Sequence, residues 1–283
     1  MISKPEDLLR GYVQVSSLPV VYTRINEAVN NPRSSTSDIS KIISDDPGLT
    51  SRLLRLVNSA FYGYPNKIDT ISRALLVVGT QQLRELALAT SVITMFEGIS
   101  GHLVNMECFW RHSIACGITA KILSTYMKTE THSERFFVAG IVHDIGRLIL
   151  LKKRPDQAEE ALMIGRSGEP LFKAEQTVLG FDHADIGRRL LVIWNIPAIL
   201  QEIVAFHHNP EGAGSHEVET AVIHVADIIA HGLQLGNSGE YFVPPLNEKA
   251  WEMLDLPLSI LPPLIEQVER EVNEVQRQIF RNN

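Results

Sequence analysis

The stretch from Val138 to Leu151 is Val-Ala-Gly-Ile-Val-His-Asp-Ile-Gly-Arg-Leu-Ile-Leu-Leu, which sets His143 and Asp144 inside a nearly continuous apolar run. Such a run predicts a buried helix, over about 133 to 153 once its flanks are included. Because burial of an unpaired carboxylate is costly, Asp144 must meet a cation or a dense set of hydrogen bonds. A metal ion is one such cation. A His-Asp pair alone is a weak signal, since short motifs also arise by chance.

The composition is that of an ordinary globular protein. The chain has 283 residues, 45% hydrophobic and 21% charged, which allows one large domain or two modest ones. The net charge of −7 is uneven, because residues 1–100 hold 10 basic and 9 acidic side chains and the remainder is acidic. Neither part has the basic surplus that strong nonspecific nucleic-acid binding requires, so nucleic acid is not an expected partner.

The cysteines and the apolar runs bear on the compartment. Cys108 and Cys116 fall in one predicted helix at a rise of about 12 Å, which is too far apart for a disulfide. Free thiols are typical of a reducing cytosol. The start lacks a signal-peptide pattern, and no apolar run reaches the roughly 18 residues of a spanning helix. We expect a cytoplasmic protein without a membrane partner.

Apolar side chains recur at helical spacing throughout, and no alternating strand pattern is present, so the sequence predicts an all-α protein. Asp46-Pro47 resembles an N-cap followed by proline at the first helical position. Gly98 to Gly101 is the best candidate boundary. The predicted parts are an N-terminal helical lobe, a second lobe and a C-terminal helical extension, at 1–100, 101–240 and 241–283. The extension carries an apolar stripe that would pack on the body or form a partner surface.

Seven side chains in five short stretches can bind metal ions. They are His112; His143 and Asp144; His183; His207 and His208; and Asp227. Because they are far apart in the chain, any site must be assembled from several helices. Nitrogen and oxygen ligands without thiolate suit two divalent ions of iron, manganese or zinc, with Asp144 as the natural bridge. His207 and His208 can serve one ion most easily at a fraying helix end, where Pro210 places them.

The charges of these groups predict an anionic ligand. Five neutral histidines and two carboxylates against two dications leave a formal surplus of about +2, which favours phosphate and hydroxide. Two ions about 3.5 to 4 Å apart stabilise the attacking and leaving oxygens of a phosphoryl displacement. A phosphate-containing small molecule or a nucleotide is therefore the expected ligand.

The seven residues and their order resemble the HD superfamily of metal-dependent phosphohydrolases, and in particular the HD-GYP cyclic-dinucleotide phosphodiesterases. The match covers roughly residues 105–235. It implies an HD-domain-like helical bundle and two divalent ions, with iron or manganese favoured and zinc, magnesium or nickel as alternatives. It also implies catalytic roles for Asp144 and for Arg147, which would steady the transition state.

The first half resembles the HDOD domain, an HD-related output domain of bacterial signalling. The resemblance spans about 15–230 and rests on four short stretches: Leu18-Pro19, Ile42 to Thr50, Leu54 to Ala60 and Ile71 to Leu75. The N-terminal lobe is then HDOD-like. The resemblance also implies that this lobe and the second lobe are two parts of one family domain. Since the chain has no room for a sensor, the resemblance implies a signalling partner that acts in trans.

Three positions depart from the phosphodiesterase pattern. The Gly-Tyr-Pro motif is missing, because Asn-Pro-Glu-Gly-Ala-Gly follows His208. Arg147 stands where those enzymes have lysine, and Cys108 where three-metal members have an extra glutamate, so two ions are expected.

Two functions stay open at this point. One is a phosphohydrolase acting on a phosphoester or nucleotide, and the other is a scaffold that keeps its metals for stability or ligand sensing. Any one histidine alone is more simply explained as a hydrogen-bonded structural residue. His102, His132, His216 and His231 are interpreted in that way, as surface or structural, and His224 as a possible support for the ligands.

Overall fold

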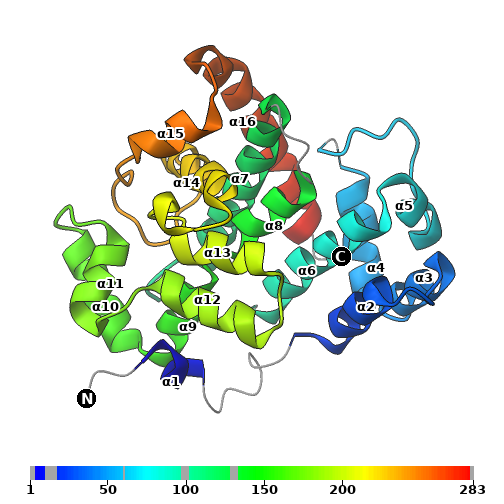
Figure 1. The fold of residues 1–283 in the computed structure, drawn as a ribbon, viewed down its shortest axis with the longest axis horizontal. Helices are drawn as coiled ribbons and strands as arrows, with labels where there is room; N and C mark the ends of the chain where they lie inside the picture. Colours follow the sequence, from blue (N-terminus) through cyan, green and yellow to red (C-terminus); the bar gives the residue numbers. More distant parts are fainter. Residues whose placement is uncertain (1–3, 10–17, 60, 97–101, 128–132, 281–283) are drawn as a thin grey trace.

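The computed structural model describes residues 4–9, 18–59, 61–96, 102–127 and 133–280. Every regular element in those ranges is a helix, which confirms the all-α prediction (Figure 1). The helices of the first part are α1 Pro5–Leu9, α2 Val20–Asn30, α3 Thr36–Ser44, α4 Pro47–Val57, α5 Ile71–Val77 and α6 Thr80–Met95. Those of the second part are α7 Met106–Tyr126, α8 Ser133–Val142, α9 Ile145–Lys153, α10 Pro155–Gly165, α11 Leu171–Leu179, α12 His183–Ile193, α13 Ala198–Phe206, α14 Glu217–Gly232, α15 Glu248–Leu254 and α16 Leu261–Phe280, with short 3₁₀ turns at Pro210–Gly212 and Leu258–Ile260.

Helices α2 to α6 form a lobe beside the larger group that contains α7 to α14 (Figure 1). α6 joins the two, because it packs against α2 and α4 and also against α8. The predicted cap is confirmed, since the Asp46 side chain accepts a hydrogen bond from the backbone N–H of Leu49 at 2.9 Å, with Pro47 in the first turn. The candidate boundary at Gly98 to Gly101 lies outside the described residues, so the three-part division stays a prediction.

The stretch from Val138 to Leu151 is two helices, not the single helix predicted. α8 ends at Val142 and α9 begins at Ile145, so His143 and Asp144 form the turn between them. His143 Nδ1 lies 2.7 Å from the carbonyl oxygen of Gly140, one of the carbonyls that the end of α8 leaves without a helical partner. Apolar spacing could not reveal the break, because both segments are buried on all sides.

Four glycines let the central helices touch through their backbones. A Cβ on Gly140 of α8 would lie 2.2 Å from the backbone nitrogen of Gly117 on α7. A Cβ on Gly146 of α9 would lie 2.0 Å from the carbonyl oxygen of His183 and 2.6 Å from the backbone nitrogen of Gly187, both on α12. These two contacts bring four helices together around the turn at His143 and Asp144.

We expect Gly146→Ala to destabilise the protein by more than about 2 kcal/mol, because its methyl group would collide with backbone atoms that cannot move aside. Thermal denaturation with and without added Mn²⁺ measures the loss. The increase in melting temperature on adding Mn²⁺ should also become smaller, because α12 carries His183. Gly165→Ala is the matched control, since its nearest atom would lie at an ordinary 3.7 Å. Equal melting temperatures for the two variants would show that the α9–α12 contact is not tight.

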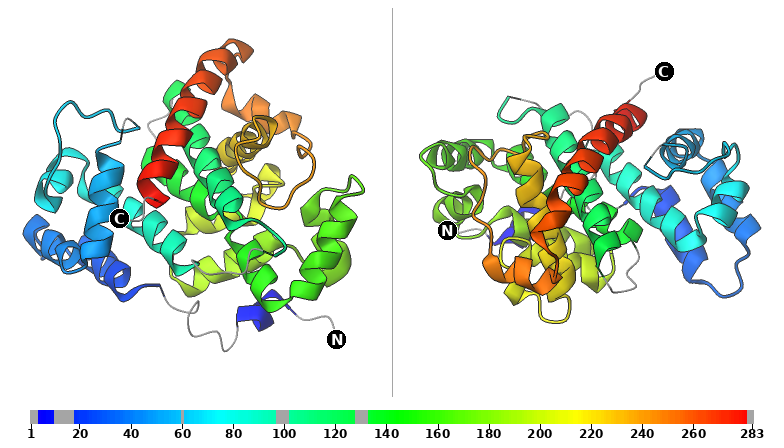
Figure 2. Two further views of the ribbon diagram at one scale, coloured as in Figure 1. Left: turned by 180° about the vertical axis from the view of Figure 1, so that it is seen from behind. Right: turned by 90° about the horizontal axis from the view of Figure 1, so that it is seen from above.

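The C-terminal extension packs on the body, which decides between the two alternatives left open by its sequence. α16 lies along α7 and also contacts α4 (Figure 2). Four residues of the predicted stripe are fully buried and the fifth, Ile279, is partly buried; the four are Leu264, Val268, Val272 and Val275.

None of the described helices combines the length and the hydropathy that crossing a lipid bilayer requires.

Candidate metal centre

The structure brings all seven predicted side chains together in one buried cluster. They come from five places in the fold: His112 from α7, His143 and Asp144 from the turn after α8, His183 from the first residue of α12, His207 and His208 from the end of α13, and Asp227 from α14. Six of them are buried and His208 is half-buried. Burial of so many polar groups demands compensation.

One half of the cluster is built around His183. Its Nε2 atom lies 2.9 Å from Asp144 Oδ1, 3.0 Å from His208 Nε2 and 3.4 Å from His207 Nε2. His207 and His208 leave the end of α13 with their ring centroids 3.9 Å apart, so the end of the helix does bring the two neighbours to the same point. Nitrogen and oxygen atoms at about 3 Å from one another are spaced like neighbouring ligands of one ion with metal–ligand distances of about 2.1 Å.

The other half is built around Asp227. Its Oδ1 atom lies 2.9 Å from His112 Nε2 and 3.6 Å from His143 Nε2. His143 also faces the first half, since its Nε2 lies 3.4 Å from Asp144 Oδ2. The turn at His143 and Asp144 thus stands between the two halves.

Three of the histidines are held through Nδ1, so that Nε2 points into the cluster. His143 Nδ1 contacts the carbonyl oxygen of Gly140 at 2.7 Å, and His207 Nδ1 contacts that of Val204 at 2.9 Å. His183 Nδ1 donates to Glu175 Oε2 at 2.6 Å. A hydrogen bond from Nδ1 to an oxygen fixes the tautomer and leaves the Nε2 lone pair free, which is how metal-binding histidines are usually supported.

Several cluster atoms have no hydrogen-bond partner of adequate geometry. They include His112 Nε2, His143 Nε2, Asp144 Oδ1 and Asp227 Oδ1, all buried. Each can donate an electron pair, and an unpaired buried polar group is costly. The donor set therefore fits divalent cations, which would satisfy all four atoms at once.

Arg147 lies inside the cluster and not at its mouth. The residue is 2% exposed, and its guanidinium donates to Asp144 Oδ2 at 3.1 Å and to Ser238 Oγ at 2.7 Å, with Nε 3.4 Å from Glu175 Oε1. Although burial acts in the opposite direction, the charges of Arg147 and His143 hold the pKa of Asp144 well below its usual value. Arg147 is thus a built-in cation for two carboxylates.

The imidazoles divide into two protonation classes in the metal-free protein. Burial, with the charges of His143 and His183 next, lowers the pKa of His207 to about 3, so this ring is neutral. Burial and Arg147 lower the pKa of His183, but the carboxylates of Glu175 and Asp144 outweigh them and raise it to about 9. Bound dications would displace that proton, because a metal-binding nitrogen must be deprotonated.

Sequence reasoning missed four residues of this site. Glu175 contacts His183 and Ser238 contacts Arg147. Glu240 is buried and accepts from the backbone N–H of Leu171. His231, interpreted from the sequence as surface or structural, is buried at 9% exposure beside Asp227. The only local signal was the position of His231 one helical turn after Asp227. His224 fits its predicted supporting role, because its Nδ1 lies 2.8 Å from the carbonyl oxygen of His207.

A cavity of about 370 Å³ opens on the cluster and is lined by His208 and Asp227, with Lys173 and Asn247 among its other residues. The Phe172 ring stacks on His208 with centroids 4.3 Å apart. A small phosphorylated molecule has the size for such a cavity.

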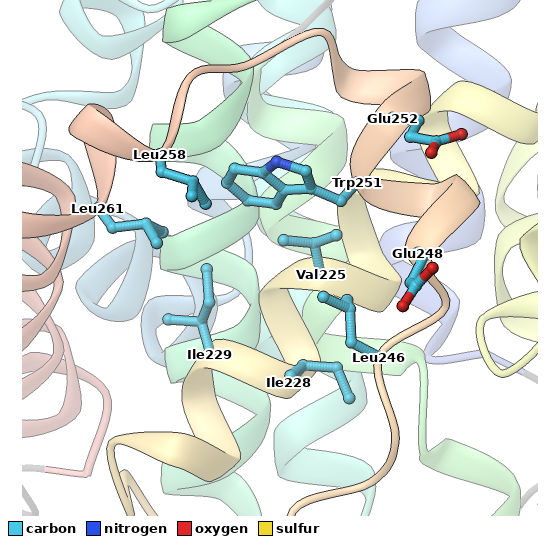
Figure 3. A pocket seen from close by; sticks show the side chains of 9 residues that line it. All are labelled: Val225, Ile228, Ile229, Leu246, Glu248, Trp251, Glu252, Leu258 and Leu261. Carbon is cyan, nitrogen blue, oxygen red and sulfur yellow. The ribbon is translucent and has the colours of Figure 1, made fainter.

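A second cavity, of about 380 Å³, lies beyond this mouth and shares Ile228 and Leu246 with it. Figure 3 shows the Trp251 ring over its centre and Glu248 at its edge. Because its lining is mainly apolar and its charged groups are acidic, this cavity does not suit phosphate.

Glu240 supplies a pH-dependent term in stability. Burial raises its pKa to about 7, against the partial opposing effect of Arg147. Since the folded pKa lies above the usual 4.5, the folded state favours the protonated acid, and stability falls as the pH rises from about 4.5 to about 7. We expect Glu240→Gln to remove this loss. The free energy of unfolding of the variant, relative to that of wild type, should therefore increase by about 2 to 3 kcal/mol from pH 5 to pH 8. Urea denaturation at the two pH values measures it, and a constant difference would contradict the assignment.

The described residues form an all-helical protein that gathers five histidines and two aspartates in its interior. Residues 15–210 match the HDOD domain, which is more than half of the chain. The chain therefore belongs to the HDOD domain family, as its sequence predicts. One curated relative, an uncharacterized protein of Treponema pallidum (strain Nichols), is 26% identical over 196 residues, which are 69% of this chain and only 38% of that protein.

Solved structures share the fold over nearly the whole chain. An HDOD domain protein of unknown function from Geobacter sulfurreducens superposes with a TM-score of 0.78 at 20% identity, covering 97% of this chain and 95% of that one. A proposed phosphohydrolase from Shewanella amazonensis SB2B gives 0.74 at 25% identity, with 96% and 97% covered. A proposed metal-dependent phosphohydrolase from the same organism gives 0.68 at 21% identity, with 97% and 99% covered.

Proposed function

We propose that this chain is a bacterial signalling output protein that binds two divalent metal ions and hydrolyses a phosphoester or nucleotide. The observation that supports this most is the convergence of imidazole Nε2 and carboxylate atoms whose other faces are already hydrogen-bonded. Iron or manganese fits the nitrogen and oxygen donors best, with zinc, magnesium and nickel as alternatives. The likeness to a proposed phosphohydrolase at 25% identity adds support.

The proposed ligands divide between the two halves of the cluster. His183, His207 and His208 would hold one ion, His112, His143 and Asp227 the other, and Asp144 would join them. The ions, when bound, would lower the pKa of a water molecule and stabilise the charge that develops on phosphate oxygens.

The charges of the surrounding residues favour an anionic substrate. Glu175 and Arg147 add one negative and one positive charge, which cancel, so the surplus of about +2 that the seven ligands leave on two dications persists. Lys173 lies at the mouth and adds a positive charge on the path of entry. A phosphate group would therefore be drawn to the cavity beside His208.

We propose that Arg147 positions Asp144 in addition to any contact with the transition state. One of its nitrogens already donates to Asp144 and Ser238, and another lies 3.3 Å from His183 Nε2. A direct contact with phosphate would require the guanidinium to give up one of these bonds.

The test is hydrolysis by protein loaded with Fe²⁺ or Mn²⁺, offered a cyclic dinucleotide, a set of mononucleotides and p-nitrophenyl phosphate. We expect metal-dependent release of phosphate or nucleotide from at least one of them, and none from the Asp144→Asn variant. Absence of turnover of every substrate in protein that demonstrably holds both ions would reject the enzymatic proposal.

One observation favours a second candidate, a non-catalytic scaffold that engages a signalling protein in trans. Arg147 neutralises Asp144 without any metal, so the cluster has a way to persist when no ion is bound. A His143→Ala, Asp144→Ala double variant separates the two functions. If it stays folded and still binds its partner while the cellular phenotype disappears, the scaffold-only function is excluded.

A further inference from the structure

We propose that His231 is a further ligand of the ion beside Asp227, so that this ion has His112, His143, Asp227 and His231 in addition to the shared Asp144. The inference rests on the proposed metal centre and names a residue that the seven-residue pattern lacks. His231 follows Asp227 by four residues on α14, so both side chains project from the same face of the helix.

The geometry of His231 is that of a ligand. Its Nε2 lies 3.4 Å from Asp227 Oδ1, and its ring centroid lies 4.2 Å from that of His112. Donor atoms of His112, Asp227 and His231 all fall within 4.8 Å of one another, which a single ion can span. All three residues are buried.

No competing role accounts for His231. Within the described part of the chain, neither of its ring nitrogens has a hydrogen-bond partner besides the approach to Asp227. The other two histidines of this region differ in that respect. His224 contacts the carbonyl oxygen of His207 and accepts from the backbone N–H of Asn247 at 2.9 Å, and His216 pairs with Glu202 at 2.8 Å.

Cys116 is the alternative donor for this half, because its sulfur atom and donor atoms of His143 and Asp227 all lie within 4.8 Å of one another. Its Sγ points at the carbonyl oxygen of Ile223, 3.9 Å away, so its thiol hydrogen already has an acceptor. Full burial also raises the pKa of this thiol, which opposes formation of the thiolate that binds metals. His231 needs no such ionisation, because a neutral imidazole is itself a ligand.

With His231 included and Asp144 shared, one ion would have four protein ligands and the other five. His183, His207, His208 and Asp144 form the first set, and His112, His143, Asp227, His231 and Asp144 form the second. Iron and manganese accept six ligands, so each ion would keep at least one open position for water or a phosphate oxygen.

The experiment counts Mn²⁺ by elemental analysis and by titration calorimetry in wild type, His231→Ala and His216→Ala. His216 is the matched control, because it is a half-buried histidine at the start of the same helix. We expect two ions in wild type and in His216→Ala. In His231→Ala we expect one ion to bind as before and the affinity for the other to fall at least about tenfold.

Helical content by circular dichroism shows whether His231→Ala is folded. If it is not, His231→Asn decides, since it keeps a polar side chain and should show the same loss, whereas His231→Asp supplies a carboxylate and should retain both ions. Two ions of unchanged affinity in a folded His231→Ala or His231→Asn variant would overturn the role of His231 while leaving the metal centre intact. No Mn²⁺ in wild type would instead overturn the metal centre itself.

Discussion

Asp144→Asn is expected to lower metal-dependent hydrolysis by at least about a thousandfold, equivalent to about 4 kcal/mol of transition-state stabilisation. Asparagine keeps the shape of the side chain but removes the charge that lies between the two halves of the cluster. The carboxylate oxygens of Asp144 lie 2.9 Å from His183 Nε2 and 3.4 Å from His143 Nε2, so the change would affect both proposed ions.

Two measurements accompany the activity of this variant. Elemental analysis should show fewer than two ions per chain, and the increase in melting temperature on adding Mn²⁺ should shrink, because bound metal stabilises only the folded state. Asp156→Asn, an exposed substitution in the first turn of α10, is the control and should change neither. A variant with wild-type metal content and activity would show that Asp144 is not a ligand.

Arg147→Met is expected to destabilise the metal-free protein by about 3 to 5 kcal/mol. Methionine fills much of the same space but removes the guanidinium beside Asp144 and Glu175, so that the two buried carboxylates have only the neighbouring imidazoles to offset their charge. Urea denaturation in the presence of a chelator measures the effect. Arg166→Met is the control, since this exposed arginine contacts the exposed Tyr241 and lies outside the cluster.

The same variant should respond more strongly to metal than wild type does. Mn²⁺ can replace the missing positive charge beside Asp144, so its addition should raise the melting temperature of Arg147→Met by more than that of wild type. An Arg147→Met protein as stable as wild type without metal would mean that Arg147 does not neutralise these carboxylates.

The sequence predicted the helices well where amphipathic spacing and caps agreed. Asp46 and Pro47 begin α4 as expected, and the stripe from Leu264 to Val275 is buried on the body. The break at His143 was missed because periodicity reports which side of a helix is buried, and here every side is buried.

The seven clustered side chains were found from chemistry, order and family resemblance together. The residues that support them were not, because their roles depend on tertiary contacts. Glu175 is a single acid in an ordinary amphipathic helix, and only the packing of α11 against α12 brings it to His183. His231 resembles any helix-end histidine until the fold places it against His112.

The most direct test of the metal centre is an elemental count on protein purified without affinity-tag metals and then equilibrated with Fe²⁺ or Mn²⁺. We predict close to two ions per chain, and their loss in the His143→Ala, Asp144→Ala double variant. A folded wild-type protein that takes up no ion at saturating supply would contradict the account, because the unpaired Nε2 and Oδ1 atoms would then be neutralised by protons and Arg147 alone.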